Sequence, residues 1–488
     1  MLKVSFCALL LSTASFAGSA NPNPTWWNKY QYLSTHAPSA LSSSASLTVG
    51  TNVDVSSECG PQSETYITLN AAHPKTLAAG SNEIFRDPMR GYYSTNGGAS
   101  WGGVDLPLPA PLSGTNDSRF GSDPTLAFDT AGNLFYGYIV VFFGGGNGVK
   151  GTEMAVARST DGGKTYPAVT YFNFATGSDH FNDKPMITSD TSAASPFHDR
   201  VYLAWDAASG GSTGGGIRVA TSADHGASFS VARADDPSGP GHSIGAVPFV
   251  GPSGQLYVAW NDYAASAITF NRSLDGGATW GTAHVIAPQS IGFQINVPAE
   301  ATRGALLYPA CDTDRSFGAH AGRLVCSWMD LNVAGNTDIF VAYSDDEGST
   351  WSNPAPATDR LGGVDRFNHW LSIDPTTGDV FVAFSDTRND TTGARYGFDE
   401  YLSVSLDGAR TFLANTRVSN QTSNEHDCNG LYPCPGINLG NQTGDYEGLV
   451  AYGGVAHPVW TDSRRNLETT SSCSRGLMEE VFTAAVSQ

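Results

Sequence analysis

The chain has 488 residues and a formal net charge of -20 at pH 7, with 26 Lys and Arg against 46 Asp and Glu. This acidic balance disfavours nucleic acid and anionic membranes as partners, because both need a basic protein surface. With 55 Gly, 11% aromatic residues and 15% charged residues, the composition is typical of exported, turn-rich β structure. After residue 20 no stretch is apolar enough to span a bilayer, so we expect no membrane insertion.

The first segment of the chain has the pattern of a secretory signal. Residues 1–20 begin with a basic residue, continue with an apolar run and end in small residues. We therefore expect a secreted protein, extracellular or periplasmic. A lead-in without strand alternation follows at residues 21–43, and one domain is predicted over residues 44–488.

The cysteines favour disulfides over a metal site. Of seven cysteines, Cys7 lies in the predicted signal, and six in an exported chain indicate three disulfides. Several connectivities are open from the sequence. Closeness along the chain favours Cys311 with Cys326 and Cys428 with Cys434, which leaves Cys59 with Cys473.

An eight-residue pattern returns six times, with Ser first, Asp or Asn third, Gly fifth and an aromatic residue last. The copies lie at residues 94–101, 159–166, 222–229, 273–280, 344–351 and 405–412. Each copy predicts a hairpin turn, because Asp accepts hydrogen bonds from its own turn, Gly adopts a positive φ and the aromatic residue packs under the loop. Ala409 replaces the fifth-position Gly in the last copy, so we expect that turn to be distorted.

Four strand-like segments accompany each copy of this turn. In the second unit they are DPTLAFD, NLFYGYIVVF, EMAVARS and, after the turn, TYPAVTYF. The copies are about 62 residues apart, and the 76 residues after Phe412 hold one further unit with three strands. The segment from Ser46 to Val55 can supply its fourth strand and close the ring. We predict an all-β propeller of four-stranded blades, with seven blades favoured and six as the alternative.

The six turn motifs resemble the Asp-box, or BNR repeat, of the sialidase superfamily. In that family the boxes join the third and fourth strands of propeller blades, on the face away from the active site. The resemblance spans nearly the whole predicted domain and implies a β-propeller. It implies little about activity, because one fold can carry many functions.

Charged residues recur where the predicted strands approach the mouth of such a propeller. Acidic residues follow the second strands at Asp206, Asp262, Asp330, Asp386 and Asp462. The first strands begin near Asp123, Asp183 with Lys184, His242, Asp365 with Arg366 and His369, and Asp445 to Glu447. A repeated Asp at a strand end also caps the adjoining turn, which is the alternative role for Asp206, Asp262 and Asp330.

Sialidases place a nucleophilic Tyr, assisted by a Glu, late in the chain, with an Asp as acid/base. The resemblance implies Tyr446 as nucleophile, with Asp445, Glu447 and Asp386 as catalytic carboxylates. A phenol suits an anionic substrate, because a carboxylate nucleophile would repel it. Adjacent strand residues point to opposite faces, which leaves other carboxylates as alternatives to Glu447. These are Glu64, Glu400 and Glu479.

An arginine triad binds the substrate carboxylate in sialidases, and this chain offers several candidates. The predicted substrate-binding residues are Arg86, Arg366, Arg388, Arg464, Arg465 and His369. Guanidinium groups bind carboxylates bidentately, which suits an acidic sugar. Arg86 stands in Phe85-Arg86-Asp87-Pro88, which departs from the Arg-Ile-Pro motif of sialidases because Asp87 takes the place of Ile.

The sequence therefore favours a sialidase-like glycoside hydrolase that removes terminal acidic sugars from glycoconjugates by a retaining mechanism. A polysaccharide lyase, with His369 abstracting a proton beside a uronate, is one alternative. A non-catalytic propeller that binds carbohydrate or protein is the other. We expect a monomer without a cofactor or a catalytic metal. The many Asp oxygens would suit a structural Ca²⁺, although no EF-hand spacing occurs.

Overall fold

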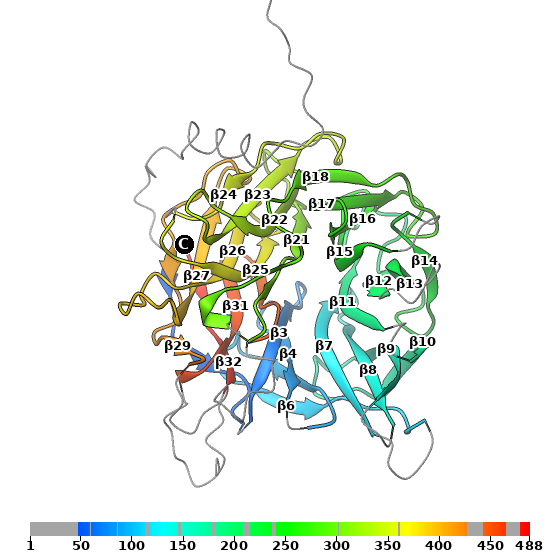
Figure 1. The fold of residues 1–488 in the computed structure, drawn as a ribbon. Coiled ribbons are helices and arrows are strands. Elements are labelled where there is room, and N and C mark those ends of the chain that lie inside the picture. Colours follow the sequence, from blue (N-terminus) through cyan, green and yellow to red (C-terminus); the bar gives the residue numbers. More distant parts are fainter. Residues whose placement is uncertain are drawn as a thin grey trace, which may run out of the picture.

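The protein is a seven-bladed β-propeller with four-stranded antiparallel blades around one axis, as the sequence predicts (Figure 1). The computed structural model describes residues 47–58, 60–84, 86–112, 118–144, 148–177, 181–207, 215–236, 241–300, 302–359, 362–426, 443–464 and 479–488. The predicted signal and lead-in lie outside these residues. No helix within these ranges is long and apolar enough to cross a membrane.

The first strands of neighbouring blades contact one another around the axis, and the later strands follow outwards. Blade 1 comprises β3 (Gln62–Leu69), β4 (Leu77–Glu83), β5 (Arg90–Ser94) and β6 (Gly102–Asp105). Blade 2 comprises β7 (Ser118–Phe128), β8 (Leu134–Phe143), β9 (Val149–Ser159) and β10 (Ala168–Thr176). Blade 3 comprises β11 (Asn182–Ser189), β12 (Val201–Ala207), β13 (Gly216–Ser222) and β14 (Ser230–Arg233). Blade 4 comprises β15 (Ser243–Val250), β16 (Leu256–Asp262), β17 (Ala267–Ser273) and β18 (His284–Pro288). Blade 5 comprises β21 (Pro309–Thr313), β22 (Leu324–Leu331), β23 (Thr337–Ser344) and β24 (Ala355–Pro356). Blade 6 comprises β25 (Arg366–Ile373), β26 (Val380–Asp386), β27 (Gly397–Ser405) and β28 (Thr416–Arg417), with β29 (Ser423–Asn424) beside β27.

Blade 7 joins the two ends of the described chain. It contains β30 (Gly448–Tyr452), β31 (Val455–Asp462), β32 (Glu480–Thr483) and β2 (Val53–Asp54). Strand β2 pairs with β32, and β1 (Thr48–Val49) pairs with β33 (Val486–Ser487). The predicted closure of the ring by the segment from Ser46 to Val55 is thereby confirmed.

Each repeated turn connects the third and fourth strands of a blade. In the copy at 273–280, the Ser273 hydroxyl donates to Asp275 at 2.8 Å and accepts the Gly277 amide at 2.9 Å. The amide and hydroxyl of Thr279 donate to Asp275 at 2.9 and 2.6 Å. The carboxylate thus holds the turn together, because it accepts four hydrogen bonds from groups of the same turn.

The last copy of the turn is regular, so the predicted distortion at Ala409 is wrong. Ala409 adopts a φ of 69°, and its amide donates to the Ser405 hydroxyl at 2.8 Å, as glycine does in the other copies. Thr411 donates to Asp407 as its counterparts do. The hydrogen bonds of the turn therefore hold alanine in the left-handed region that it otherwise avoids.

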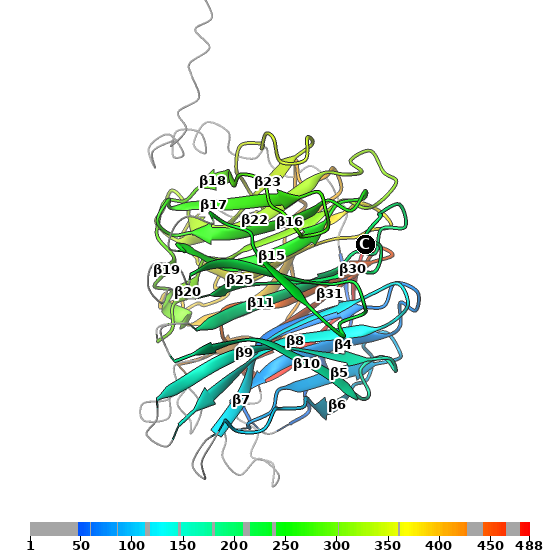
Figure 2. The ribbon, with the colours of Figure 1, turned by 90° about the vertical axis from the view of Figure 1, so that its right-hand side faces the viewer.

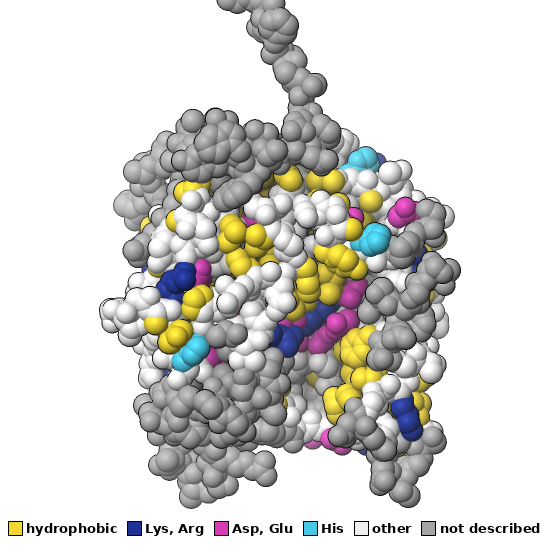
Figure 3. Space-filling view, viewed as in Figure 1, with side chains coloured by type: hydrophobic (Ala, Val, Ile, Leu, Met, Phe, Trp, Pro, Cys, Tyr) yellow, Lys and Arg dark blue, Asp and Glu magenta, His cyan; other side chains and the backbone are white. Residues whose placement is uncertain are grey.

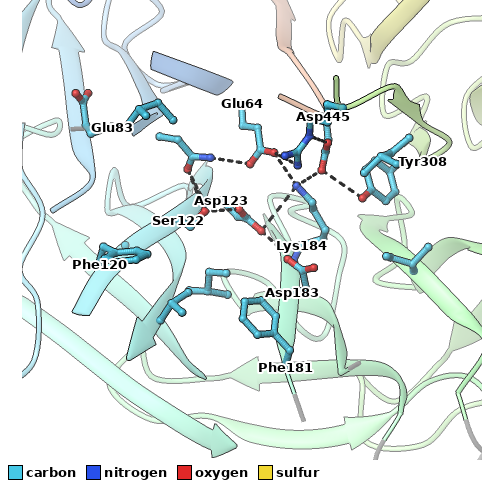
Figure 4. A pocket seen from close by; sticks show the side chains of 18 of the residues that line it. Glu64, Glu83, Phe120, Ser122, Asp123, Phe181, Asp183, Lys184, Tyr308 and Asp445 are labelled. Carbon is cyan, nitrogen blue, oxygen red and sulfur yellow. Dashed lines mark hydrogen bonds and ion pairs between the residues drawn. The ribbon is translucent and has the colours of Figure 1, made fainter. Parts of the chain in front are cut away.

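Five of the first strands contain a β-bulge near their beginning. The bulges hold residues with positive φ, namely Glu64, Asp123, Lys184, Gly245 and Asn368. A bulge re-aims a side chain relative to a regular strand. In blades 1, 2 and 3 it brings the side chains of Glu64, Asp123 and Lys184 together at the axis (Figure 4).

A hairpin between blades 4 and 5 lies at one end of the propeller (Figure 2). It consists of β19 (Gln294–Ile295) and β20 (Ala305–Leu306), with the short 3-10 segment η1 (Pro298–Glu300) between them. The repeat pattern did not predict this hairpin. Beyond it, Cys311 and Cys326 form the predicted disulfide between β21 and β22. The other paired cysteines lie outside the described residues.

Candidate functional site

A cavity of about 750 Å³ opens at the end of the axis where the first strands begin (Figure 3). Residues of blades 1 to 4, the hairpin and the segment before β30 line it. Its volume lies within the usual range of small-molecule sites. The turn motifs lie at the other end of the blades, because each third strand runs away from the mouth. The cavity is therefore the candidate functional site.

A network of ion pairs forms the floor of this cavity (Figure 4). The Lys184 ammonium lies 2.9 Å from a Glu64 oxygen and 3.9 Å from an Asp123 oxygen, and it also contacts Asp445. Arg303, from the hairpin, contacts the same two acids, with one nitrogen 3.1 Å from Glu64 and another on Asp445. Two cations thus bridge carboxyl groups of three blades.

Glu64 and Asp445 share these cations but have opposite pKa shifts. Burial raises the pKa of Glu64 to about 8, although Lys184 opposes this shift. Burial would also raise the pKa of Asp445, but Lys184 and Arg303 outweigh it and hold the pKa below its usual range. Burial thus favours the protonated form of Glu64, whereas Lys184 and Arg303 favour the ionised form of Asp445. Such a divergence between neighbouring acids separates a proton donor from a carboxylate that stays ionised.

Uncharged side chains fix the orientation of the carboxyl groups. The Asn82 amide donates to Glu64 at 2.8 Å, and its oxygen accepts the backbone amide of Asp123 at 2.8 Å. The Ser122 hydroxyl donates to Asp123 at 2.6 Å. Because each acid has fixed partners, the network presents a defined geometry to a ligand.

The walls of the cavity combine aromatic rings with one further acid of raised pKa. The aromatic side chains that line it belong to Phe120, Phe143, Phe181, Phe293 and Tyr308. Burial raises the pKa of Glu83 to about 7, and the Tyr92 hydroxyl donates to it at 2.9 Å. Apolar ring faces beside a few polar groups are typical of sites that bind small organic ligands such as sugars.

Two of the predicted catalytic and substrate-binding residues line the cavity, as does Glu64, which the sequence offers as an alternative to Glu447. Asp445 lies in the ion-pair network, and Arg86 lies at the wall, where it contacts Glu58 at 2.7 Å and also Asp105. The predicted Arg86 is therefore at the cavity, but its guanidinium is already paired with carboxylates of the protein.

Tyr446 and Glu447 lie beneath the cavity, and neither lines it. The buried Tyr446 hydroxyl donates to the Pro124 carbonyl at 3.1 Å, and its ring centroid lies 5.2 Å from the Lys184 ammonium. Burial raises the pKa of Glu447 to about 8, and the Thr461 amide donates to it at 3.2 Å. The nucleophilic role of Tyr446 stays a prediction.

Three predicted residues form an internal group of ion pairs in blade 6. The fully buried Arg366 lies 2.9 Å from Asp386 and 3.0 Å from Asp338. Arg388 lies 2.6 Å from the same Asp386, and its guanidinium stacks 4.2 Å from the Tyr401 ring. These contacts pair the two guanidinium groups with carboxylates of blades 5 and 6, away from the cavity lining.

Arg464 and His369 also lie apart from the cavity lining. Arg464 pairs with Asp462 at 2.7 Å and stacks on the Phe482 ring. His369 is buried in β25, and burial lowers its pKa to about 4. Arg465 lies outside the described residues.

Sequence reasoning missed the central cations of the site. The sequence pattern places Lys184 near the start of a first strand but gives it no role, and it does not indicate Arg303 or Tyr308. An alignment of the first strands would have placed Glu64, Asp123 and Lys184 in one column, two residues before Tyr66, Thr125 and Met186. No repeat covers the hairpin, so nothing in the pattern pointed to Arg303.

Metal-binding geometry is absent from the described part of the chain, in which no group of three or more His, Cys, Asp or Glu side chains could hold an ion. The site chemistry described above uses side chains alone. A structural Ca²⁺ stays a prediction.

No protein-family model matches the chain, and no curated protein matches it. Similar solved structures include the leech intramolecular trans-sialidase, with 11% identity, a TM-score of 0.47 and coverage of 77% of this chain and 70% of that one. The NanB sialidase from Streptococcus pneumoniae has 10% identity, a TM-score of 0.46 and coverage of 75% and 70%. An α-L-arabinofuranosidase from Fusarium graminearum has 13% identity, a TM-score of 0.44 and coverage of 73% and 98%. At these identities and scores the similarity assigns no activity.

Proposed function

We propose that the protein is a glycoside hydrolase whose active site is the axial cavity. The observation that supports this proposal is the pair Glu64 and Asp445, which share Lys184 and Arg303 but differ in protonation. Cleavage of a glycosidic bond needs one carboxylic acid that protonates the leaving oxygen and one carboxylate that acts at the anomeric carbon.

We assign the proton donor to Glu64 and the ionised group to Asp445. With a pKa of about 8, Glu64 still holds its proton at neutral pH and can transfer it to the glycosidic oxygen. Asp445 is a weak base because its pKa is low, so it stabilises the positive charge that develops on the sugar ring. The Tyr308 hydroxyl, 3.4 Å from Asp445, lies beside this carboxylate at the cavity wall.

Removal of a terminal acidic sugar, which the Asp-box resemblance implies, is the second candidate reaction. The presence of Arg86, Lys184 and Arg303 in the cavity favours it. An acidic sugar would have to compete with protein carboxylates, however, because each of these cations already contacts at least one. The geometry therefore supports glycoside hydrolysis in general better than hydrolysis of an acidic sugar.

A panel of fluorogenic aryl glycosides, including a sialoside, tests the proposal. Wild-type protein should release the fluorophore from at least one member. Glu64→Gln and Asp445→Asn should each lower the rate by about 10²–10⁴. Glu347→Gln, an exposed substitution on the opposite face, is the matched control and should keep the wild-type rate. Circular dichroism should confirm that each variant folds.

Absence of release from every glycoside would contradict the proposal, as would full activity in Glu64→Gln. A glycan array with the same proteins would then identify a carbohydrate-binding propeller, because a binding protein retains ligands without cleaving them. Release of an unsaturated product from a uronate polymer would instead indicate a lyase.

A further inference from the structure

The charges that line the cavity do not balance. Its carboxyl groups belong to Glu64, Glu83, Asp87, Asp123, Asp183 and Asp445, whereas its cations are Arg86, Lys184 and Arg303. Each of the three cations already contacts carboxylates of the protein. Within the described residues, the cavity thus offers a ligand no free cation, and because the raised pKa values of Glu64 and Glu83 favour their neutral forms, its negative charge lies on the aspartates.

The unbalanced charge is centred on Asp183 in β11. The Asp183 carboxylate accepts the Lys184 backbone amide at 3.0 Å, and within the described ranges no Lys or Arg forms an ion pair with it. Its side chain is partly exposed and faces the cavity (Figure 4). Asp183 is therefore a hydrogen-bond acceptor that a ligand can reach.

A second carboxyl group lies directly behind Asp183. Asp206 in β12 is its cross-strand partner, is 3% exposed and has one oxygen without a hydrogen-bond partner. Burial, and next to it the charge of Asp183, raises the pKa of Asp206 well above its usual range. The raised pKa favours the neutral form of Asp206, so the carboxylate that a positively charged ligand group meets at this wall is Asp183.

An apolar surface adjoins this acidic wall. Phe181 lies immediately before β11, two residues before Asp183, and lines the same cavity, as does Phe120 from β7. The C–H face of a pyranose ring can pack against such rings, and an ammonium group is attracted to an aromatic face. The same wall thus provides contacts for a sugar ring and for a positive charge on it.

We propose that the cavity selects a sugar with an unsubstituted amino group, whose ammonium binds Asp183 while the ring packs against Phe181. This inference rests on the proposed glycoside hydrolase function and names its substrate class. N-acetylation would remove the charge that Asp183 binds. A sugar carboxylate at this position would be repelled.

Binding measurements with matched oligosaccharides test the inference without relying on catalysis. The probes are tetrasaccharides of glucosamine and of galactosamine, each with free amines and in the fully N-acetylated form, and titration calorimetry at pH 6 measures the dissociation constants. We expect at least one free-amine probe to bind at least tenfold more tightly than its acetylated form. The preference should shrink at high salt, because screening weakens the ammonium contact.

Asp183→Asn should abolish this preference while leaving the affinity for the acetylated probe within about twofold. A merely structural role of Asp183 would instead weaken both probes alike. Asp262→Asn is the matched control, because Asp262 caps a turn at the end of β16 and does not line the cavity. This control should keep the wild-type preference.

Equal affinity for both forms of each probe, no binding of any free-amine probe, or an unchanged preference in Asp183→Asn would overturn the inference. Failure of this inference can be told apart from failure of the proposed hydrolase function, because binding and cleavage are measured separately. Hydrolysis of neutral or acidic glycosides without an amine preference would refute the inference and keep the hydrolase. Binding of the amine probe without cleavage of any glycoside would refute the hydrolase and keep the selectivity.

Discussion

Carboxyl groups of the repeated turns and buried glutamates near the mouth have opposite pKa shifts. In the repeated turns, the Thr279 and Ser228 side chains and nearby backbone amides donate to Asp275 and Asp224, and lower their pKa values to about 2. Near the mouth, burial raises the pKa of Glu425 to about 7 and that of Glu479 well above its usual range. The number of donors around a carboxylate, weighed against its burial, decides whether it stays ionised.

Five glutamates near the mouth form what we call the buried Glu cluster, namely Glu300, Glu400, Glu425, Glu447 and Glu479. All are at most 2% exposed, and their shifts depend on burial and on one another. The charge of Asp462 also raises the pKa of Glu400, whereas Arg303 opposes the rise in the pKa of Glu300. Thr443 links the cluster to the cavity, since it donates to Glu300 and accepts the Glu64 amide. The hydrogen bonds of the repeated turns therefore favour ionised aspartates, whereas the buried Glu cluster favours protonated side chains.

The largest effect is expected from Lys184→Met. This change leaves Glu64, Asp123 and Asp445 in the cavity floor without their shared ammonium. Breaking a buried ion pair costs about 3–5 kcal/mol, and urea unfolding should show a loss of that size. Lys164→Met, in an exposed turn, is the control, and equal stability of the two variants would contradict the network.

Glu425→Gln tests the buried Glu cluster through pH. Because its pKa rises from 4.5 to about 7 on folding, the stability from protonated Glu425 is complete below pH 4.5 and is lost as pH rises to 7. The variant stays neutral, so at pH 8 it should be more stable than wild type by about 3 kcal/mol, and at pH 4.5 nearly equal. Thermal unfolding across this range measures the difference, and a pH-independent offset would refute it.

Tyr308→Phe and Tyr446→Phe separate the tyrosine at the cavity wall from the one below it. We expect the Tyr308 change to lower kcat/KM about tenfold, or about 1.4 kcal/mol, because it removes the hydroxyl beside Asp445. Tyr446→Phe removes a hydrogen bond to Pro124 and should have a smaller effect. Complete loss of activity in Tyr446→Phe alone would instead support the nucleophile that the sequence predicts.

Asp275→Ala should lower stability by about 1 kcal/mol, because one turn loses its acceptor. This contribution has the opposite pH dependence to that of Glu425. The folded pKa of about 2 lies below the usual 3.8, so the stabilisation is present above pH 3.8 and is lost as pH falls to 2. Leu274→Ala in the same turn is the control. Equal acid sensitivity of the two variants would contradict the role of Asp275.

The repeated turns were predictable because their contacts are local. Ser273, Asp275 and Thr279 hydrogen-bond within seven residues, so the sequence alone carries the geometry. The spacing of the turn motifs predicted seven blades. Because the last unit has only three strand-like segments of its own, it also predicted that the segment containing β2 closes the ring. Ala409 was misjudged, because the strength of the turn's hydrogen bonds outweighs the preference of one residue.

The candidate site was less predictable because its contacts are distant in sequence. Lys184 meets Glu64 across 120 residues, and Arg303 meets Asp445 across 142. Bulges turn Glu64 and Lys184 to the axis, and strand alternation does not reveal a bulge. Arg366, Arg388 and Arg464 instead pair with acids at strand ends, as Arg388 does with Asp386.

The pH dependence of kcat/KM for the best glycoside tests the assignment of Glu64 most directly. We predict that activity falls as pH rises through about 8, because Glu64 then loses the proton that it donates. Glu64→Gln, compared with the Glu347→Gln control, should lose both the activity and this alkaline limb. Activity that increases through pH 8, or an unchanged profile in Glu64→Gln, would contradict the axial cavity as the catalytic site.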